Sequence, residues 1–340
     1  MIKFKAFGPI LVLILMRSSS LCTAAEVENF YKGKNIIFVI GSSAGGGFDV
    51  DGRLMARHIG NELLGKPSVV PQNMPGAGSI RAADYLYFSA PKDGTVIGII
   101  DPGVYNSQLL GEAGIRFDTA NFTWLGRMVN NTPVVFTWHN SPIQKASDLF
   151  EKEAIISASG PTPKLNYLLL NTVLKAKIKT INAYPGSAQA MLAMERGEIH
   201  GLSTPWPVMK ASKADWVKEK KVLPILQTGI EKHPEIYNVP RMIDLAKNEQ
   251  DRALFEFIGL PSLIGRAMLA PPAISEERKT NLRGAFDRMM RNPKFIADAN
   301  NSKIDLEPMS GELLQKILQE KNYVSETVIN RAREIASSPR

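Results

Sequence analysis

The sequence predicts an α/β fold. Short apolar strand candidates alternate with helix candidates through most of the chain, which is typical of α/β layering with mainly parallel sheets. The first candidate, Ile36–Ile40, is a continuous apolar run, as expected for a strand buried on both faces. Several strand candidates lead through glycine-containing loops into helices. Ligands of open α/β sheets bind outside the carboxyl ends of the strands, so these loops indicate where a site should lie.

The elements are expected in alternating order along the chain. Asp49 is expected to cap the first helix, which ends before Gly65 and Pro67. Further strands are predicted at Pro67–Val70, Thr95–Ile100, Pro133–Thr137, Ala154–Ser157, Lys179–Ala183, Ile199–Ser203, Leu223–Gln227 and Ala267–Ala270. Further helices are predicted at Ile80–Phe88, Lys164–Leu174, Ser187–Arg196, Ser275–Arg291 and Ser310–Ile335.

Residues 1–25 have the pattern of a secretory signal. A basic start is followed by a short apolar run over residues 6–16 and by small residues ending at Ala25. A membrane-spanning helix needs about 20 apolar residues, so this run is too short for an anchor. We therefore expect export with cleavage after Ala24 or Ala25. The single cysteine, Cys22, lies inside this segment, so the mature chain should have no disulfide and no catalytic thiol.

Composition and charge exclude several classes of function. The chain of 340 residues has a formal charge of +8, and three of its basic residues lie in the signal segment. The remaining +5 is spread without a basic run, which argues against nucleic acid as a partner. The histidines have no metal-ligand spacing, so neither a metal nor a cofactor is expected.

The glycine-rich loop over residues 41–49 is the most informative segment. Gly45, Gly46 and Gly47 permit close backbone approach, so amides of the loop and of the next helix can converge on an anion. A plain tight turn without a ligand is the alternative. The loop lacks the Gly-Lys-Ser/Thr ending of a nucleotide P-loop and the final glycine of a dinucleotide fingerprint. Ser43 stands in a Gly-x-Ser-x-Gly pattern, which leaves a serine hydrolase open as a second function.

Three later loops have the same strand–loop–helix setting. Residues 73–79 offer backbone amides and the Ser79 hydroxyl, residues 157–163 include Gly160 and Thr162, and residues 184–188 open the helix at Ser187. A simple Pro-Gly turn remains the alternative for residues 73–79. His200 follows a helix stop at Gly197 and either faces a ligand or serves as a structural histidine at the end of a strand.

The order of these loops resembles a known family. The motifs over residues 43–49, 73–79, 90–95, 184–188 and 195–199, with the C-terminal segments 270–272, 293–295 and 309–312, are similar to those of the extracytoplasmic solute-binding proteins of tripartite tricarboxylate transporters, the Bug-type family. The resemblance spans nearly the whole mature chain. It implies a two-lobed periplasmic-binding-protein-like fold of type II, with the ligand in the cleft between lobes.

The resemblance also implies lobe bounds, partners and site residues. Lobe one would comprise residues 26–127 and 228–340, and lobe two residues 128–227. The protein would be a monomeric, non-enzymatic receptor that hands a small carboxylate to membrane permease subunits, or a ligand-sensing regulator of the same fold. Backbone amides and ordered water would hold the carboxylate at Ala44, Gly45, Gly46, Gly47 and Phe48, and at Pro185, Gly186, Ser187 and Ala188. Phe48 and His200 depart from the residues that many members have at these places.

Overall fold

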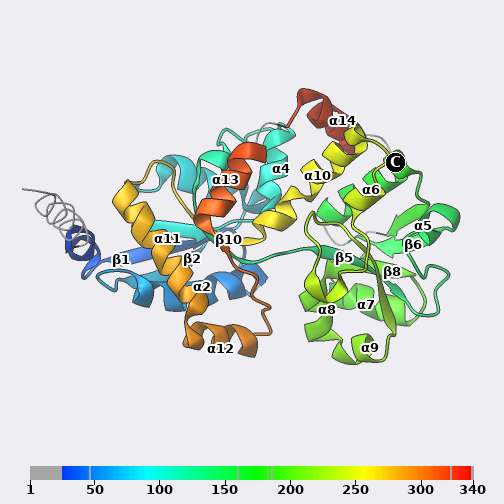
Figure 1. The fold of residues 1–340 in the computed structure, drawn as a ribbon, viewed down its shortest axis with the longest axis horizontal. Coiled ribbons are helices and arrows are strands. Elements are labelled where there is room, and N and C mark those ends of the chain that lie inside the picture. The colour runs from blue at the N-terminus through cyan, green and yellow to red at the C-terminus, as the bar shows by residue number, and fades with distance from the viewer. Residues whose placement is uncertain are drawn as a thin grey trace, which may run out of the picture.

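Two β-sheets form the framework of the protein. The computed structural model describes residues 25–45, 47–158, 161–181, 183–184, 187–321 and 324–337, and the predicted signal segment lies almost entirely outside them. One sheet lies in each half of the elongated molecule (Figure 1). Within the described residues, no helix has both the length and the apolar character needed to cross a membrane.

The first sheet, sheet A, combines parallel and antiparallel strands. Its strand order is β11-β4-β10-β3-β1-β2. β1 runs parallel to β2 and β3, whereas β10 runs antiparallel to β3 and β4. The strands are β1 (Asn35–Ile40), β2 (Ser68–Asn73), β3 (Val96–Ile99), β4 (Thr123–Val129), β10 (Arg266–Ala270) and β11 (Met309–Ser310).

The second sheet, sheet B, is built in a similar way. Its order is β7-β6-β8-β5-β9; β6 is parallel to β7 and β8, while β5 is antiparallel to β8 and β9. The strands are β5 (Pro133–Trp138), β6 (Ala154–Ser157), β7 (Ile178–Ile181), β8 (Gly201–Pro205) and β9 (Val222–Gln227). All pairings of β4, β5, β9, β10 and β11 are antiparallel. The prediction of mainly parallel sheets is therefore wrong for these strands, because an apolar run shows burial but not strand direction.

Helices cover both sheets. On sheet A lie α2 (Gly47–Glu62), α3 (Ile80–Asp84), η2 (Tyr85–Ser89), α4 (Gly103–Leu109), α11 (Glu276–Arg291), α12 (Pro293–Asn301) and α13 (Gly311–Lys321). On sheet B lie α5 (Asp148–Glu151), α6 (Pro161–Leu174), α7 (Ser187–Glu195), α8 (Trp206–Ser212) and α9 (Ala214–Lys218). Short 3₁₀ helices are η1 (Ala77–Ser79), η3 (Thr119–Asn121), η4 (Pro234–Ile236) and η5 (Met242–Leu245).

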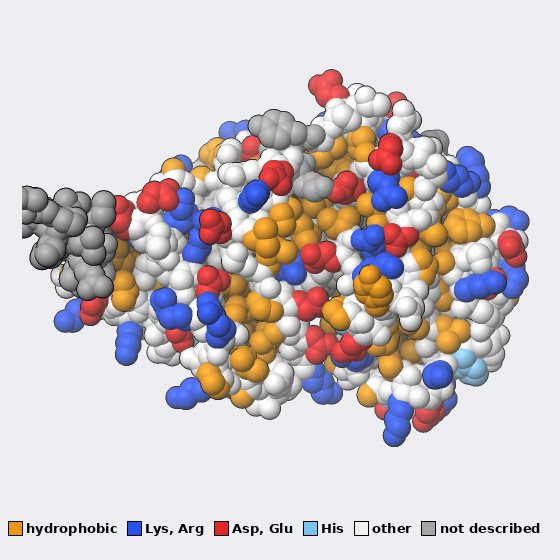
Figure 2. Space-filling model, viewed as in Figure 1, with side chains coloured by type: hydrophobic (Ala, Val, Ile, Leu, Met, Phe, Trp, Pro, Cys, Tyr) orange, Lys and Arg blue, Asp and Glu red, His pale blue; other side chains and the backbone are white. Residues whose placement is uncertain are grey.

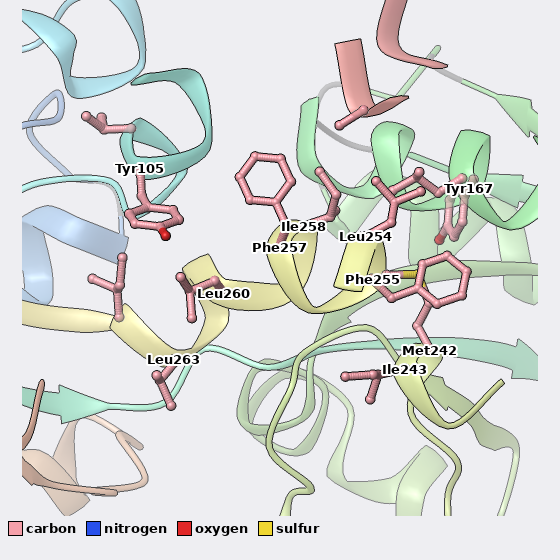
Figure 3. Close-up of a cluster of buried hydrophobic side chains, with 14 of the residues drawn as sticks. Tyr105, Tyr167, Met242, Ile243, Leu254, Phe255, Phe257, Ile258, Leu260 and Leu263 are labelled. Atoms are coloured by element: carbon pink, nitrogen blue, oxygen red, sulfur yellow. The ribbon is translucent and has the colours of Figure 1, made fainter. Parts of the chain in front are cut away.

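Two further helices, α10 (Glu249–Ile264) and α14 (Glu326–Ser337), connect the two halves. The apolar side chains of α10 point in both directions: Leu260 lies toward Tyr105 of α4, and Phe255 lies beside Tyr167 of α6 (Figure 3). One buried apolar cluster therefore extends from sheet A through α10 to sheet B. This shared core holds the two halves together on one side of the molecule.

Several predicted elements are confirmed and two need correction. The predicted strands and helices from Ile36 to Arg291 appear within a few residues of their expected bounds, although Ile80–Phe88 divides into α3 and η2. The single helix expected over Ser310–Ile335 is wrong, because α13 ends at Lys321 and α14 begins after Ser325, whose hydroxyl accepts a hydrogen bond from Val328 N–H. Asp49 is not the residue before α2 but its third residue.

Candidate functional site

The first glycine loop, residues 41–47, follows β1. The carboxyl end of β1 lies between those of β2 and β3 in sheet A. Asp49 holds this loop from within α2. Its carboxylate accepts hydrogen bonds from Gly45 N–H (2.9 Å), Arg53 Nε (2.9 Å) and Asn73 Nδ2 (2.8 Å). These bonds, led by the one from Arg53, lower the pKa of Asp49 from 3.8 to about 2. Asn73 also donates to Ser42 O, so the network fixes the loop against β2.

Ser79 ties together the three loops that follow these strands. Its hydroxyl donates to Gly41 O (2.6 Å) and accepts from Asp101 N–H (3.0 Å), and the side chain is buried. Its backbone has a φ of 76°, which is unusual for a residue other than glycine. Both hydrogen bonds are internal, so the geometry makes Ser79 a residue that positions the loops.

Arg266, the first residue of β10, brings a cation to the same edge. Its Nε donates to Asp51 Oδ2 at 2.7 Å, and its guanidinium lies 3.6 Å from the centre of the Phe48 ring. Asp101, which follows β3, is close enough for Arg266 to lower its pKa, although burial raises that pKa overall. Arg266 was not among the site residues expected from the sequence, where its signal was a basic residue immediately before the apolar run Ala267–Ala270.

A cleft of about 440 Å³ opens beside this edge. One side is lined by Gly78 and by Asp101 and Asn106 of the β3–α4 region, and the other by Leu165 of α6 and Ile258 of α10. The volume lies in the range of small-molecule sites. A larger groove of about 670 Å³ lies between the C-terminal end of α2 and α11. We give the smaller cleft more weight as a ligand site, because both halves line it and it adjoins the second glycine loop, residues 73–79.

The loops of sheet B supply the remaining predicted site residues. Ser187 and Ala188 form the start of α7, which follows β7, and Thr162 lies in the first turn of α6. Gly46, Gly160, Pro185 and Gly186 lie outside the described residues.

His200 lies away from these loops. It precedes β8, which runs parallel to β6, and its Nδ1 accepts from Ile155 N–H near the start of β6. The histidine is therefore at the amino-end side of sheet B, whereas Ser187 follows the carboxyl end of β7. Its observed hydrogen bond is structural, since it joins His200 to the backbone of a neighbouring strand.

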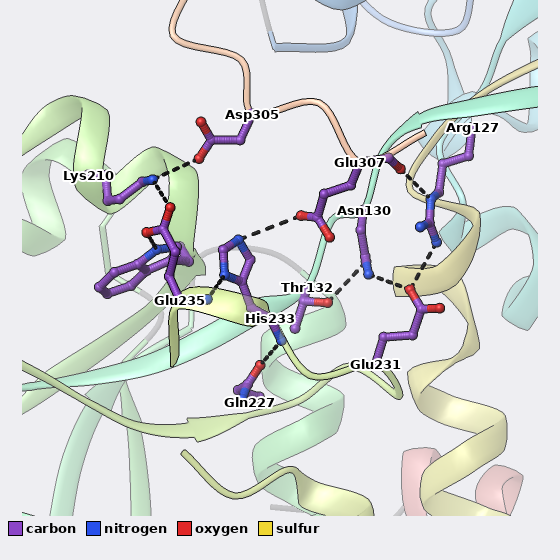
Figure 4. Close-up of polar contacts among 11 residues, drawn as sticks. Arg127, Asn130, Thr132, Lys210, Gln227, Glu231, His233, Glu235, Asp305 and Glu307 are labelled. Carbon is purple, nitrogen blue, oxygen red and sulfur yellow. Dashed lines mark hydrogen bonds and ion pairs between the residues drawn. The ribbon is translucent and has the colours of Figure 1, made fainter. Parts of the chain in front are cut away.

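Polar contacts also join the halves beside the C-terminal end of α10, where Arg127 Nη1 donates to Leu263 O (Figure 4). Lys210 of α8 contacts Glu235 (2.7 Å) and Asp305 (3.0 Å), the latter from the segment that leads to β11. Arg127 of β4 contacts Glu231 at 3.1 Å, and His233 lies 3.6 Å from Glu307. Acidic side chains gather along the boundary between the halves (Figure 2). These contacts lie close to the chain crossings and bridge the two sheets.

The setting of Ser43 differs from that of a nucleophile. A nucleophile elbow places its serine in a strained turn directly before a helix. Ser43 is exposed, has no positive φ, and is separated from α2 by three residues.

Three of the four histidines have partners away from the glycine loops: His58 contacts Asp298, His200 contacts Ile155, and His233 contacts Glu307. Among the described residues no group of three or more His, Cys, Asp or Glu side chains could hold a metal ion.

Comparison with known proteins identifies the class of fold. No family model matches the chain. A protein of Cupriavidus necator described as "UPF0065 protein in gbd 5'region" is 22% identical over 294 residues, covering 84% of this chain and 82% of that protein. A TctC solute-binding protein from Polaromonas superposes with a TM-score of 0.67 at 16% identity, covering 88% of this chain and 99% of that one. The fold is therefore that of the periplasmic solute-binding proteins, and the predicted two-lobed α/β class is confirmed.

Two other solved structures make the likeness more specific. The periplasmic binding protein BugD matches with a TM-score of 0.60 at 18% identity, covering 91% of this chain and all of that one. An R. palustris protein solved with adipate matches with a TM-score of 0.60 at 20% identity, covering 88% of this chain and 97% of that one. The resemblance to TctC and Bug-type proteins that the loop motifs indicated is thus confirmed at the level of fold.

Proposed function

We propose that this protein is an exported, non-enzymatic receptor that captures a small carboxylate between two lobes and delivers it to a tripartite tricarboxylate-type membrane transporter. The main support is the cleft that the carboxyl-end loops of sheet A share with α6 and α10. The adipate in the related R. palustris structure supports a carboxylate as the class of ligand. The protein is proposed to act as a monomer in the periplasm, after cleavage of residues 1–25.

The proposed lobes follow the two sheets. Lobe one, residues 26–127 and 228–340, contains most of sheet A, and lobe two, residues 128–227, contains sheet B. The segment after β9 first remains beside sheet B, where Gln227 pairs with Arg241, and then returns through α10. Relative rotation of the lobes would bring the loops after β1 and β7 toward the same ligand.

We assign two kinds of role to the site residues. Backbone amides at Ala44, at Gly46 to Phe48 and at Gly186 to Ala188 are proposed to bind the carboxylate, with Pro185, Gly160 and Thr162 beside them. Gly45 N–H and the Ser79 hydroxyl already have internal partners, so these two residues are proposed to shape the loops. One hydrogen bond to a charged group contributes about 1.5–3 kcal/mol, so three or four donors approach the roughly 8 kcal/mol of micromolar binding.

The test uses the mature chain from Glu26 onward. Native mass spectrometry should show a monomer with a small acid bound, and calorimetry with adipate, malate and citrate should detect binding of at least one acid. The neutral diamide of that acid serves as the matched control and should not bind. Absence of a bound acid together with no binding of the three acids contradicts the proposal.

Two alternatives give different results. A serine hydrolase would cleave a test ester and lose that activity in Ser43→Ala, whereas the receptor should hydrolyse nothing and bind its acid equally well in this variant. A sensor of the same fold would bind the acid, but cells that lack the protein would still take up the radiolabelled acid. Loss of uptake in those cells supports the role in transport.

A further inference from the structure

Arg266 lies where the chain returns to sheet A from the other half of the molecule. It follows Gly265, which ends α10 with a φ of 52°, and it pairs with Val129, the last residue of β4 before the chain crosses to sheet B. Because β10 is antiparallel to β3, Arg266 lies at the edge where β3 ends and Asp101 follows. The guanidinium is therefore fixed at the side of sheet A that faces sheet B.

Two neighbours orient the guanidinium. Asp51 of α2 binds its Nε at 2.7 Å, and the Phe48 ring lies against its face at 3.6 Å from the ring centre. The Arg266 side chain is 16% exposed and that of Asp51 is 12% exposed. This arrangement leaves Arg266 little rotational freedom, so it would lose little entropy on binding a ligand.

The outer nitrogens of the guanidinium lie near the start of α2. Nη1 is buried and has no hydrogen-bond partner among the described residues. Nη2 lies 3.6 Å from the position that a Cβ on Gly47 would occupy, which puts it beside the exposed first turn of α2. The first N–H groups of a helix have no partner within the helix. Two kinds of donor, the helix amides and the arginine, therefore point to one place next to the first glycine loop.

We propose that Arg266 is the charged anchor for one carboxylate group of the ligand and thereby makes a free, ionised carboxylate a requirement for binding. This inference rests on the proposed function and adds a side chain to a site otherwise built from backbone amides. Asp51 acts as the positioning residue that holds Nε. The absence of a side chain at Gly47 leaves room for a carboxylate to approach Nη2.

The experiment compares two variants that both lack the ion pair. Asp51→Asn retains the guanidinium, and the double variant Asp51→Asn with Arg266→Gln removes it. Calorimetry with adipate, malate and citrate at several salt concentrations should give at least tenfold weaker binding in the double variant than in the wild type, with Asp51→Asn between the two. The dependence of the dissociation constant on salt should also become smaller, because one charged contact is lost. Thermal unfolding of each variant checks that it is folded.

A third variant, Arg266→Lys, retains the positive charge and the partner Asp51 but lacks the planar group with its Nη donors. It should bind the acid several-fold more weakly than the wild type. If the wild type binds an acid and the double variant or Arg266→Lys binds it as tightly as the wild type, the anchor role is wrong and the proposed function stands. If the wild type binds none of the three acids, the proposed function fails and the anchor role with it.

Discussion

Replacing Ser79 with alanine tests whether the loops at the edge of sheet A depend on one hydroxyl. The change removes the donor to Gly41 O (2.6 Å) and the acceptor for Asp101 N–H (3.0 Å) from a buried position. An unsatisfied buried group costs about 1–3 kcal/mol, so the free energy of unfolding should fall by about 2–4 kcal/mol. Urea unfolding followed by circular dichroism measures this change.

Two matched variants separate the hydrogen bonds from the backbone. Ser79→Gly loses the same two bonds but relieves the φ of 76°, so it should be about 1 kcal/mol more stable than Ser79→Ala. Ser43→Ala removes an exposed hydroxyl from the neighbouring loop and should change the free energy of unfolding by less than about 0.5 kcal/mol. If Ser79→Ala is as stable as Ser43→Ala, the hydroxyl does not hold the loops together.

Two further predictions concern charged groups. Because the pKa of Asp49 falls from 3.8 to about 2 on folding, its ionised form stabilises the protein above pH 3.8, and this contribution is lost as the pH drops toward 2. The stability difference between the wild type and Asp49→Asn should therefore shrink over that interval in acid titrations monitored by fluorescence; a constant difference contradicts the assignment. Lys210→Met removes contacts to the half-exposed Glu235 and Asp305, so it should lower the free energy of unfolding by no more than about 1 kcal/mol. Urea unfolding measures this change, and a loss above about 2 kcal/mol would contradict the prediction.

The predicted strands follow directly from the sequence where a strand is apolar and uninterrupted, as in β1 and β6. β4 was missed because Gly126 and Arg127 interrupt its apolar pattern. In the structure Gly126 has a φ of 154°, and a Cβ there would lie 2.1 Å from the Phe286 ring of α11. The requirement for glycine at position 126 comes from a helix far along the chain, so no local sequence pattern could reveal it. α10 was also missed, because its apolar residues lie on more than one face where it contacts both halves.

The glycine-rich loops of the candidate site are visible in the sequence. The role of each polar group was not visible, because it depends on partners that are distant in the chain. Ser79 was expected to face a ligand, yet it bonds to residues 38 and 22 positions away. Arg266 meets Asp51 across 215 positions. A single sequence shows which groups could bind an anion, whereas the fold determines which of them are already occupied.

The position of Arg266 also bears on how the lobes would close. The chain leaves sheet A at Val129 and returns at Arg266, and these two residues pair in neighbouring strands. At this crossing Gly265 is packed so closely that a Cβ would lie 2.1 Å from Val129 O. Groups beside a hinge move least when two bodies rotate about it. An anchor at this place would therefore keep its geometry in open and closed states, while the loops after β7 move toward the ligand. The charge would then bind the acid first, and the amides of sheet B would favour closure afterwards.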